Sequence, residues 1–409
     1  MRKSSCQSLE AVNRIPDPLV AQFRRFTSSL IEQGYADVTV RSKVKLVTNF
    51  LQWLKRRRLA VADLDESRME AFLKRKQRER RGDLRTLQHF LDHLRGQNLI
   101  PARNLPCDRS PLALILNRYE TYLRTERGLV THTILEYQSF VRKFLLARFR
   151  GRPLLLKAVK AADISDFVLR CTRGMDVRRA QLMTTAFRSF FRFLFQQGEL
   201  QADLATSVPT VANWRLATVP KYLTPQEVKR VLKACDRHTA VGCRDYAILL
   251  LLARLGLRAG EVVGLQLEDI NWRAGEILVR GKGLLHDRMP LPPDVGQAVA
   301  SYLRRGRPAC RIRRVFICTK APRRGFAHPS TLSTIVRRAL ARADLHPPLQ
   351  GAHLLRHSLA TSMLRSGATM REIAEILRHR ALNTTEIYAK VDFEGLRSLA
   401  QPWPMGGAQ

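Results

Sequence analysis

Six side chains in the C-terminal half of the sequence have types suited to phosphoryl chemistry: Arg258, Lys282, His353, Arg356, His379 and Tyr388. The tyrosine lies in "LRHRALNTTEIYAKV", residues 377–391, nine positions after the second histidine. A phenol has a pKa near ~10 and is a poor nucleophile at neutral pH. It attacks a phosphodiester usefully only if cations neutralise the phosphate oxygens and the leaving alkoxide receives a proton.

The other five residues are of the types that could supply this help. A planar arginine fork bonds two phosphate oxygens at once, and a lysine in a turn can protonate a leaving oxygen. Lys282 lies in such a turn, "GKG". Histidines can orient the phosphate or accept the tyrosine proton. His353 and Arg356 are three positions apart and share a helix face. The sequence has no obvious cluster of acidic metal ligands, so we predict no metal and no other cofactor.

Each of these features also has an ordinary structural explanation. An arginine after Gly-Leu is commonly a surface ion-pair partner, and a lysine between glycines is commonly a solvated turn. A histidine and an arginine three positions apart are a common helical pair, and a tyrosine in an amphipathic helix usually packs in a core. The order and spacing of all six residues together favour the functional interpretation.

Four short segments carry a family resemblance: "GLRAGE" at 256–261, "GKGLLHDRMPLP" at 281–292, "HLLRHSLAT" at 353–361, and 377–391. In this order they resemble the catalytic segments of the tyrosine recombinase, or phage-integrase, family. The resemblance covers residues 221 to about 399, and residues 112–201 resemble the helical core-binding domain of the family.

The resemblance implies a role for each residue. Tyr388 would attack the scissile phosphate and become joined to the 3′ phosphate, releasing a 5′ hydroxyl. Arg258 and Arg356 would clamp the non-bridging oxygens, with a hydrogen bond from His379. Lys282 would be the general acid for the leaving oxygen. In addition, His353 would assist as an acid, a base or a positioning group. The covalent ester conserves the energy of the broken bond, so strands could be rejoined without ATP.

The resemblance also implies partners. The substrate would be double-stranded DNA recombination sites, with no small-molecule substrate. Exchange of strands between two duplexes requires several active sites, so we expect a homo-tetramer on two DNA sites, possibly with related recombinases. The C-terminal residues 392–409 are expected to dock on a neighbouring subunit.

Three positions depart from the family pattern. Arg378 stands where glycine is common, and Arg380 where a small hydroxyl residue is usual. Gly260 lies in the first segment, where a better helix former is expected. The six catalytic residue types are intact.

Composition independently favours a polyanionic partner. The 409 residues include 71 Lys and Arg against 35 Asp and Glu, a net charge of +36. Arginine-rich codon usage, solvated surface arginines and acidic membranes are the competing explanations. We expect neither a signal peptide nor a membrane anchor, and the seven cysteines lack metal-ligand spacing. We therefore expect reduced thiols and a cytoplasmic, nucleoid-associated protein with no membrane partner.

The predicted fold is mainly α, with a small antiparallel sheet (α+β) in a C-terminal catalytic domain, and the N-terminal DNA-binding part is all-α. We predict an additional helical module at 1–105, a SAM-like core-binding domain at 110–205, a linker at 206–221 and the catalytic domain at 222–409. The first module looks like a repeat of the second, displaced by about 94 residues, with Thr39 and Thr133 as matching helix caps.

Local signals predict the elements that carry the site. Thr224, Pro225 and Glu227 form a capping box at the start of the domain. Alternating residues on both sides of the Gly-Lys-Gly turn predict a strand pair. Helices are expected at about 295–304, 332–343, 353–366 and 370–379. Asn383 should cap a short helix, with Glu386 as its capping partner. This helix should present Tyr388 to a groove.

Three other functions remain open from the sequence. A type IB topoisomerase shares the catalytic residue types but acts without a partner site. A DNA-binding regulator with a decayed catalytic domain would not need all six residues intact. A basic protein of membrane surfaces would need an amphipathic segment with an isolated bulky apolar face, which the sequence lacks.

Overall fold

The computed structural model describes residues 17–75, 80, 82–102, 108–212, 219–281, 286–379, 384–391 and 397. It is mostly helical with one small antiparallel sheet, which confirms the predicted fold class. The chain divides into two compact units, one of residues 103–217 and the other of residues 1–102 with 218–409. In the ranges described, no helix combines the length and apolar character needed to cross a bilayer.

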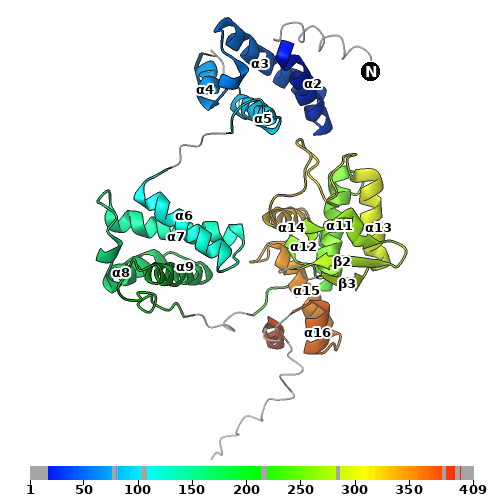
Figure 1. Ribbon diagram of the computed structural model, residues 1–409. Helices are drawn as coiled ribbons and strands as arrows, with labels where there is room; N and C mark the ends of the chain where they lie inside the picture. Colours follow the sequence, from blue (N-terminus) through cyan, green and yellow to red (C-terminus); the bar gives the residue numbers. More distant parts are fainter. Residues whose placement is uncertain are drawn as a thin grey trace, which may run out of the picture. The chain divides into compact units, whose positions relative to one another are not determined.

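The N-terminal helices form a small bundle (Figure 1). Its elements are α2 (Asp17–Glu32), α3 (Asp37–Arg56), the 3-10 turn Val61–Asp63, α4 (Glu66–Arg75) and α5 (Asp83–Gly96). The apolar residues of each helix recur with the helical period and therefore face a common interior. Phe26, Phe50 and Phe90 are completely buried in it.

Residues 111–196 form a second bundle with its own core. Its elements are α6 (Pro111–Thr125), α7 (Thr131–Phe149), the 3-10 turn Leu156–Ala158, α8 (Ala161–Thr172) and α9 (Val177–Gln196). Ser110 caps α6 by accepting a hydrogen bond from the Ala113 amide at 3.2 Å, with Pro111 at the first helical position. Aromatic rings dominate the core, including Tyr119, Phe144 and Phe187.

The two bundles have the same order of elements, including the 3-10 turn after the second helix. α3 and α7 begin 94 residues apart, and so do α5 and α9. The predicted caps are wrong, however. α3 begins at Asp37 and α7 at Thr131, so Thr39 and Thr133 lie inside the first turn, where no cap is needed.

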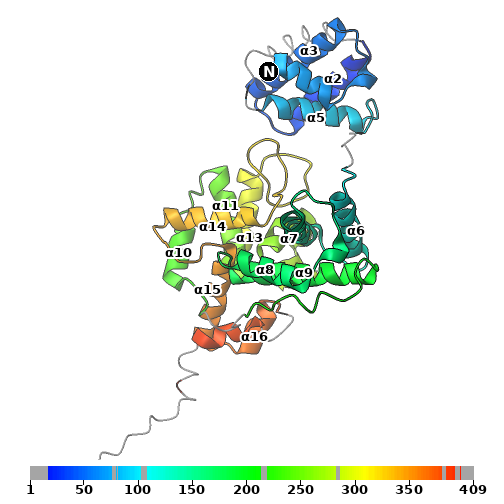
Figure 2. The ribbon, with the colours of Figure 1, turned by 90° about the vertical axis from the view of Figure 1, so that its left-hand side faces the viewer.

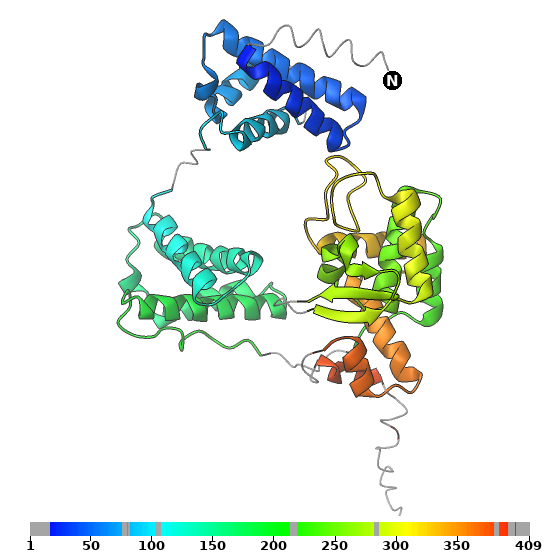
Figure 3. The same cartoon turned by 45° about the vertical axis from the view of Figure 1, so that its right-hand side comes forward.

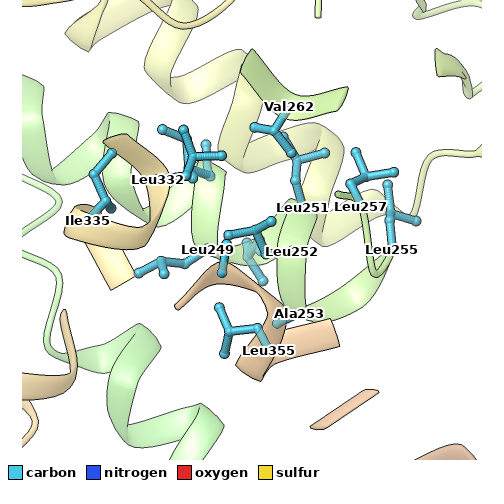
Figure 4. Close-up of a cluster of buried hydrophobic side chains, with 14 of the residues drawn as sticks. Leu249, Leu251, Leu252, Ala253, Leu255, Leu257, Val262, Leu332, Ile335 and Leu355 are labelled. Carbon is cyan, nitrogen blue, oxygen red and sulfur yellow. The ribbon is translucent and has the colours of Figure 1, made fainter. Parts of the chain in front are cut away.

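The C-terminal helices form a further compact group, in which most of them pack against α11 (Figure 2). They are α10 (Pro225–Lys233), α11 (Ala240–Arg254), α12 (Ala259–Gly264), α13 (Pro293–Ser301) with the π-helical turn Tyr302–Gly306, α14 (Ser330–Arg342), α15 (Ala352–Arg365) and α16 (Met370–Ile376). α11 contacts α10, α12, α13, α14 and α15. Its apolar run, residues 247–253, is buried all round, as expected of a central helix. Figure 4 shows Leu249 and Leu252 among leucines of α14 and α15.

The capping box predicted at α10 is confirmed. The Glu227 amide donates to Thr224 Oγ1 at 3.3 Å, and the Thr224 amide donates to Glu227 Oε2 at 2.7 Å. Pro225 occupies the first helical position, where its missing N–H costs nothing.

The predicted strand pair is also confirmed, with a short third strand added (Figure 3). The antiparallel sheet has the order β1 (Ile270–Asn271), β2 (Glu276–Arg280) and β3 (His286–Pro290). Arg280 of β2 pairs with His286 of β3, so the Gly-Lys-Gly segment connects the two strands. Lys282 itself lies outside the residues that the structure describes, as do Arg380 and the expected cap Asn383.

Candidate active site

Arg356 is fixed inside the protein by two main-chain carbonyls. It lies on α15, and its guanidinium donates to the oxygens of Gly256 and Leu377. Gly256 has a left-handed backbone (φ 57°) just after α11, and Leu377 follows α16. Burial, and secondly the neighbouring Arg258, lower the Arg356 pKa to about 10, so the group stays charged at neutral pH. This arginine ties α11, α15 and α16 together.

Arg258 precedes α12 and is oriented by Glu261, which lies in the first turn of that helix. The Arg258 amide donates to Glu261 Oε2 at 2.7 Å, and Arg258 Nη1 donates to Glu261 Oε1 at 2.9 Å. Arg258 Nη2 donates to the Arg378 carbonyl at 3.3 Å. The Arg258 side chain is 42% exposed, against 6% for Glu261. A buried carboxylate therefore holds a guanidinium that solvent, or a ligand, can reach.

His379 follows α16 and is half-buried. Its Nδ1 lies 2.8 Å from Thr385 Oγ1. Burial lowers the pKa of His379 to about 4, and the positive charges of Arg356 and Arg258 act in the same direction. The imidazole is therefore neutral at pH 7 and acts through hydrogen bonds rather than through charge.

Tyr388 is buried, and the prediction that it faces a groove is wrong. The side chain is 1% exposed, in a 3-10 turn, Glu386–Val391, that contacts both α15 and α16. Its ring packs in a small apolar cluster with Ala360, Ile373, Leu377 and Val391. The short segment after α16 folds back on these helices, so residues of α15 and α16, together with Leu377 and Val391, cover the ring.

The Tyr388 hydroxyl nevertheless has polar and cationic neighbours. It lies 2.9 Å from Nδ1 of His357 on α15. Burial raises the Tyr388 pKa to about 12, while the charge of Arg356 lowers it. The phenol is therefore neutral at pH 7, and its hydroxyl contacts His357 and feels the charge of Arg356.

The structure thus places Arg258, Arg356, His379 and Tyr388 near the starts of α12 and α15 and the end of α16. His353 is exposed on α15, one turn before His357, and the two rings are 6.4 Å apart. In the part of the chain that the structure describes, no three His, Cys, Asp or Glu side chains are grouped to hold a metal ion.

Sequence reasoning did not single out His357. The residue lies in the quoted segment "HLLRHSLAT", four positions after His353, so helical spacing could have placed both on one face. Nothing in the sequence, however, shows that the tyrosine 31 positions downstream returns to this ring.

Comparison with known proteins assigns the family. The Phage integrase family pattern matches residues 221–394, and that of the Phage integrase, N-terminal SAM-like domain matches residues 116–198. The Sinorhizobium fredii protein named "Putative integrase/recombinase y4rA" is 45% identical over 405 residues, 98% of each chain. Tyrosine recombinase XerD of Mycobacterium tuberculosis is 33% identical over 304 residues, covering 70% of this chain and 96% of XerD.

Solved structures show the same fold. XerH site-specific recombinase bound to a palindromic difH substrate matches with a TM-score of 0.59 at 20% identity, over 73% of this chain and 98% of XerH. A lambda integrase dimer bound to a COC′ core site matches with a TM-score of 0.52 at 18% identity, and the match covers 72% of this chain and 99% of the chain in that structure. The chain belongs to the phage integrase family of tyrosine recombinases.

Proposed function

We propose that this recombinase binds double-stranded DNA recombination sites, and cuts and rejoins them through a covalent 3′-phosphotyrosine at Tyr388, without metal or ATP. The observation that carries the proposal is the gathering of two arginines, a neutral histidine and a phenol near the starts of α12 and α15 and the end of α16. The XerH and lambda integrase structures are of DNA-bound proteins and support DNA as the substrate.

The two arginines are suited to different parts of phosphate binding. Arg258 is partly exposed, and its fork is oriented by Glu261, so it can receive a phosphate oxygen directly. Arg356 is buried and adds positive charge to the site, where the low local dielectric constant strengthens its attraction for a phosphate. Neutral His379 would donate a hydrogen bond to the same phosphate, and exposed His353 would help to position it.

Tyr388 needs both a proton acceptor and a change of position. Its hydroxyl already lies 2.9 Å from His357 Nδ1, within reach for proton transfer. Because the side chain is 1% exposed, a DNA phosphate reaches it only if the segment 384–391 moves enough to uncover the hydroxyl, and His357 accepts the proton only if this movement keeps the two groups in contact. On this proposal, attack by the phenol forms the tyrosyl–phosphate bond and breaks the bond to the 5′ oxygen.

Lys282 would supply the proton for that leaving 5′ oxygen. The lysine belongs to the segment between β2 and β3, whose last paired residues are Arg280 and His286. Rejoining follows the same path in reverse, with a 5′ hydroxyl of another strand as the attacking group and Tyr388 as the leaving group.

The helical bundles would hold the DNA. We propose that residues 110–205 are the core-binding domain, that residues 1–105 are an additional module repeating its element order, that 206–221 is a linker and that 222–409 is the catalytic domain. Strand exchange would use a homo-tetramer on two sites, with 392–409 docked on a neighbouring subunit. Cytoplasmic, nucleoid-associated DNA would be the setting.

A suicide substrate tests the chemistry. A nicked duplex carrying the site is incubated with the protein without Mg²⁺, and a covalent protein–DNA band is sought after denaturation. Tyr388→Phe should abolish the band and leave DNA binding intact, because it removes only a hydroxyl. A band that survives this change would show that Tyr388 is not the nucleophile.

The same assay tests the general acid. Lys282→Ala should slow cleavage of the ordinary substrate but not of one with a 5′-thio leaving group, which needs little protonation. Equal slowing on both substrates would remove Lys282 from this role. The topoisomerase alternative is not favoured, because the relatives carry the names of recombinases and integrases; relaxation of a supercoiled plasmid that lacks the site would reinstate it.

A further inference from the structure

Arg378, which departs from the family pattern, has several contacts in the site. Its side chain is 10% exposed and its backbone has a left-handed φ of 53°. Such a backbone suits glycine best and is strained for other residues. An arginine that accepts this conformation needs compensating contacts, and those of Arg378 lead to two different parts of the active site.

One set of contacts leads to the phosphate-binding arginines. Arg378 Nη2 donates to Glu261 Oε2 at 2.5 Å, and the same carboxylate holds Arg258. The Arg378 carbonyl also accepts from Arg258 Nη2 at 3.3 Å. In the sequence Arg378 is flanked by Leu377, whose carbonyl accepts a hydrogen bond from Arg356, and by His379. Arg378 thus adjoins three of the proposed catalytic groups.

The other set of contacts leads to strand β3. Arg378 Nε lies 3.6 Å from Asp287 Oδ2, and Arg378 Nη1 contacts the Met289 sulfur. Asp287 and Met289 are two positions apart in β3, so their side chains project from the same face of the sheet. Asp287 lies two positions beyond residue 285, where the segment that contains Lys282 ends.

We propose that Arg378 is a positioning residue that holds the β2–β3 strand pair against Arg258 and His379. The inference rests on the proposed role of Lys282, which lies between β2 and β3 in the sequence, and adds a connection between the strand pair that flanks the proton donor and the phosphate clamp. The general acid and the clamp come from segments far apart in sequence, and a displacement of about 1 Å between such groups can cost roughly a hundredfold in rate.

Arg378→Gly is the decisive variant. Glycine adopts a φ of 53° without strain, so the change removes the guanidinium while favouring the same backbone. Arg371→Ala is the matched control, because it removes an arginine of α16 that is 85% exposed and pairs only weakly with Glu375.

The first measurement compares leaving groups. With the ordinary suicide substrate we expect Arg378→Gly to slow covalent complex formation about a hundredfold. With the 5′-thio substrate we expect the rate to fall by no more than about tenfold. Lys282→Ala should show the same difference, Arg258→Ala should not, and Arg371→Ala should match the wild type. A deficit that is equal on both substrates, or no deficit, would overturn the proposal, since a merely structural role does not depend on the leaving group.

The second measurement needs no catalysis. Amide hydrogen exchange in β2 and β3 (residues 276–280 and 286–290) should be faster in Arg378→Gly than in wild type or Arg371→Ala, because β3 loses its contacts to the Arg378 side chain. Unchanged exchange would overturn the proposal. A wild-type protein that forms no covalent complex would overturn the proposed function instead, and exchange would still decide whether Arg378 holds β3.

Discussion

Glu261 is the single buried carboxylate among three guanidiniums in the described part of the site, and Glu261→Gln is the sharpest perturbation of the arrangement. Its Oε1 accepts from Arg258 Nη1, and its Oε2 accepts from the Arg258 amide and from Arg378 Nη2. Glutamine has nearly the same shape, so packing is retained. Its NH₂ group must face at least one of these donors, and the negative charge is lost.

The expected cost follows from these contacts. A hydrogen bond to a charged group contributes about 1.5–3 kcal/mol, and removal of one partner of a buried pair costs about 3–5 kcal/mol. Solvent screening lowers the share of Arg258, whose side chain is 42% exposed. We therefore expect Glu261→Gln to lower the free energy of unfolding of the C-terminal core by about 3 kcal/mol, roughly a hundredfold in the unfolding equilibrium.

Hydrogen exchange of the α11 amides, followed by mass spectrometry, measures this quantity, because these amides exchange only when the core opens. Glu375→Gln is the control: its carboxylate is 67% exposed and pairs with Arg371, so we expect a change below about 0.5 kcal/mol. Exchange in Glu261→Gln within about 1 kcal/mol of wild type would show that Glu261 does not hold the arginines as described.

Three further predictions concern neighbouring groups. Folding lowers the His379 pKa from 6.5 to about 4, so the unfolded state binds more protons than the folded state between these pH values. The stability that His379 contributes is therefore complete above pH 6.5 and is lost as the pH falls toward 4. Urea midpoints should therefore drop more from pH 7 to 4.5 in wild type than in His379→Asn, and equal drops would contradict this. Arg356→Lys should slow cleavage about a hundredfold at unchanged DNA affinity in filter binding, because an ammonium cannot span the Gly256 and Leu377 carbonyls; a near-normal rate would refute this need for a fork. Leu249→Ala should cost about 2–5 kcal/mol in urea unfolding because the side chain is completely buried, whereas Leu135→Ala, at a site 57% exposed, should cost far less; equal costs would contradict the central place of α11 (Figure 4).

Local signals in the sequence predicted the first helix and the strand pair of the C-terminal part, but not the short strand β1. Thr224 and Glu227 form their capping box through contacts within four residues, and the strand pair follows from alternation on both sides of a turn. Cap positions within the N-terminal bundles were less predictable. Thr39 and Thr133 are good capping types, but the helices begin nearly one turn earlier, at Asp37 and Thr131; in α3 the charge of Asp37 is favourable at the helix N-terminus.

The site was only partly predictable because its contacts are long-range. Family resemblance selected the residue types, but the burial of Tyr388 depends on how the turn 386–391 packs on α15 and α16. The same is true of His357, whose partner is 31 positions away, and of Arg378, whose role depends on a strand 89 positions earlier. Periodicity describes one element at a time and contains no information about such contacts.

The most direct test of the account is to locate the covalent bond. Wild-type protein trapped on a nicked suicide substrate in EDTA is digested with nuclease and protease, and the adduct is mapped by mass spectrometry. The account predicts a nucleotide joined through its 3′ phosphate to the Tyr388 oxygen, on a peptide from residues 379–391. An adduct on another residue, or attached through a 5′ phosphate, would contradict it.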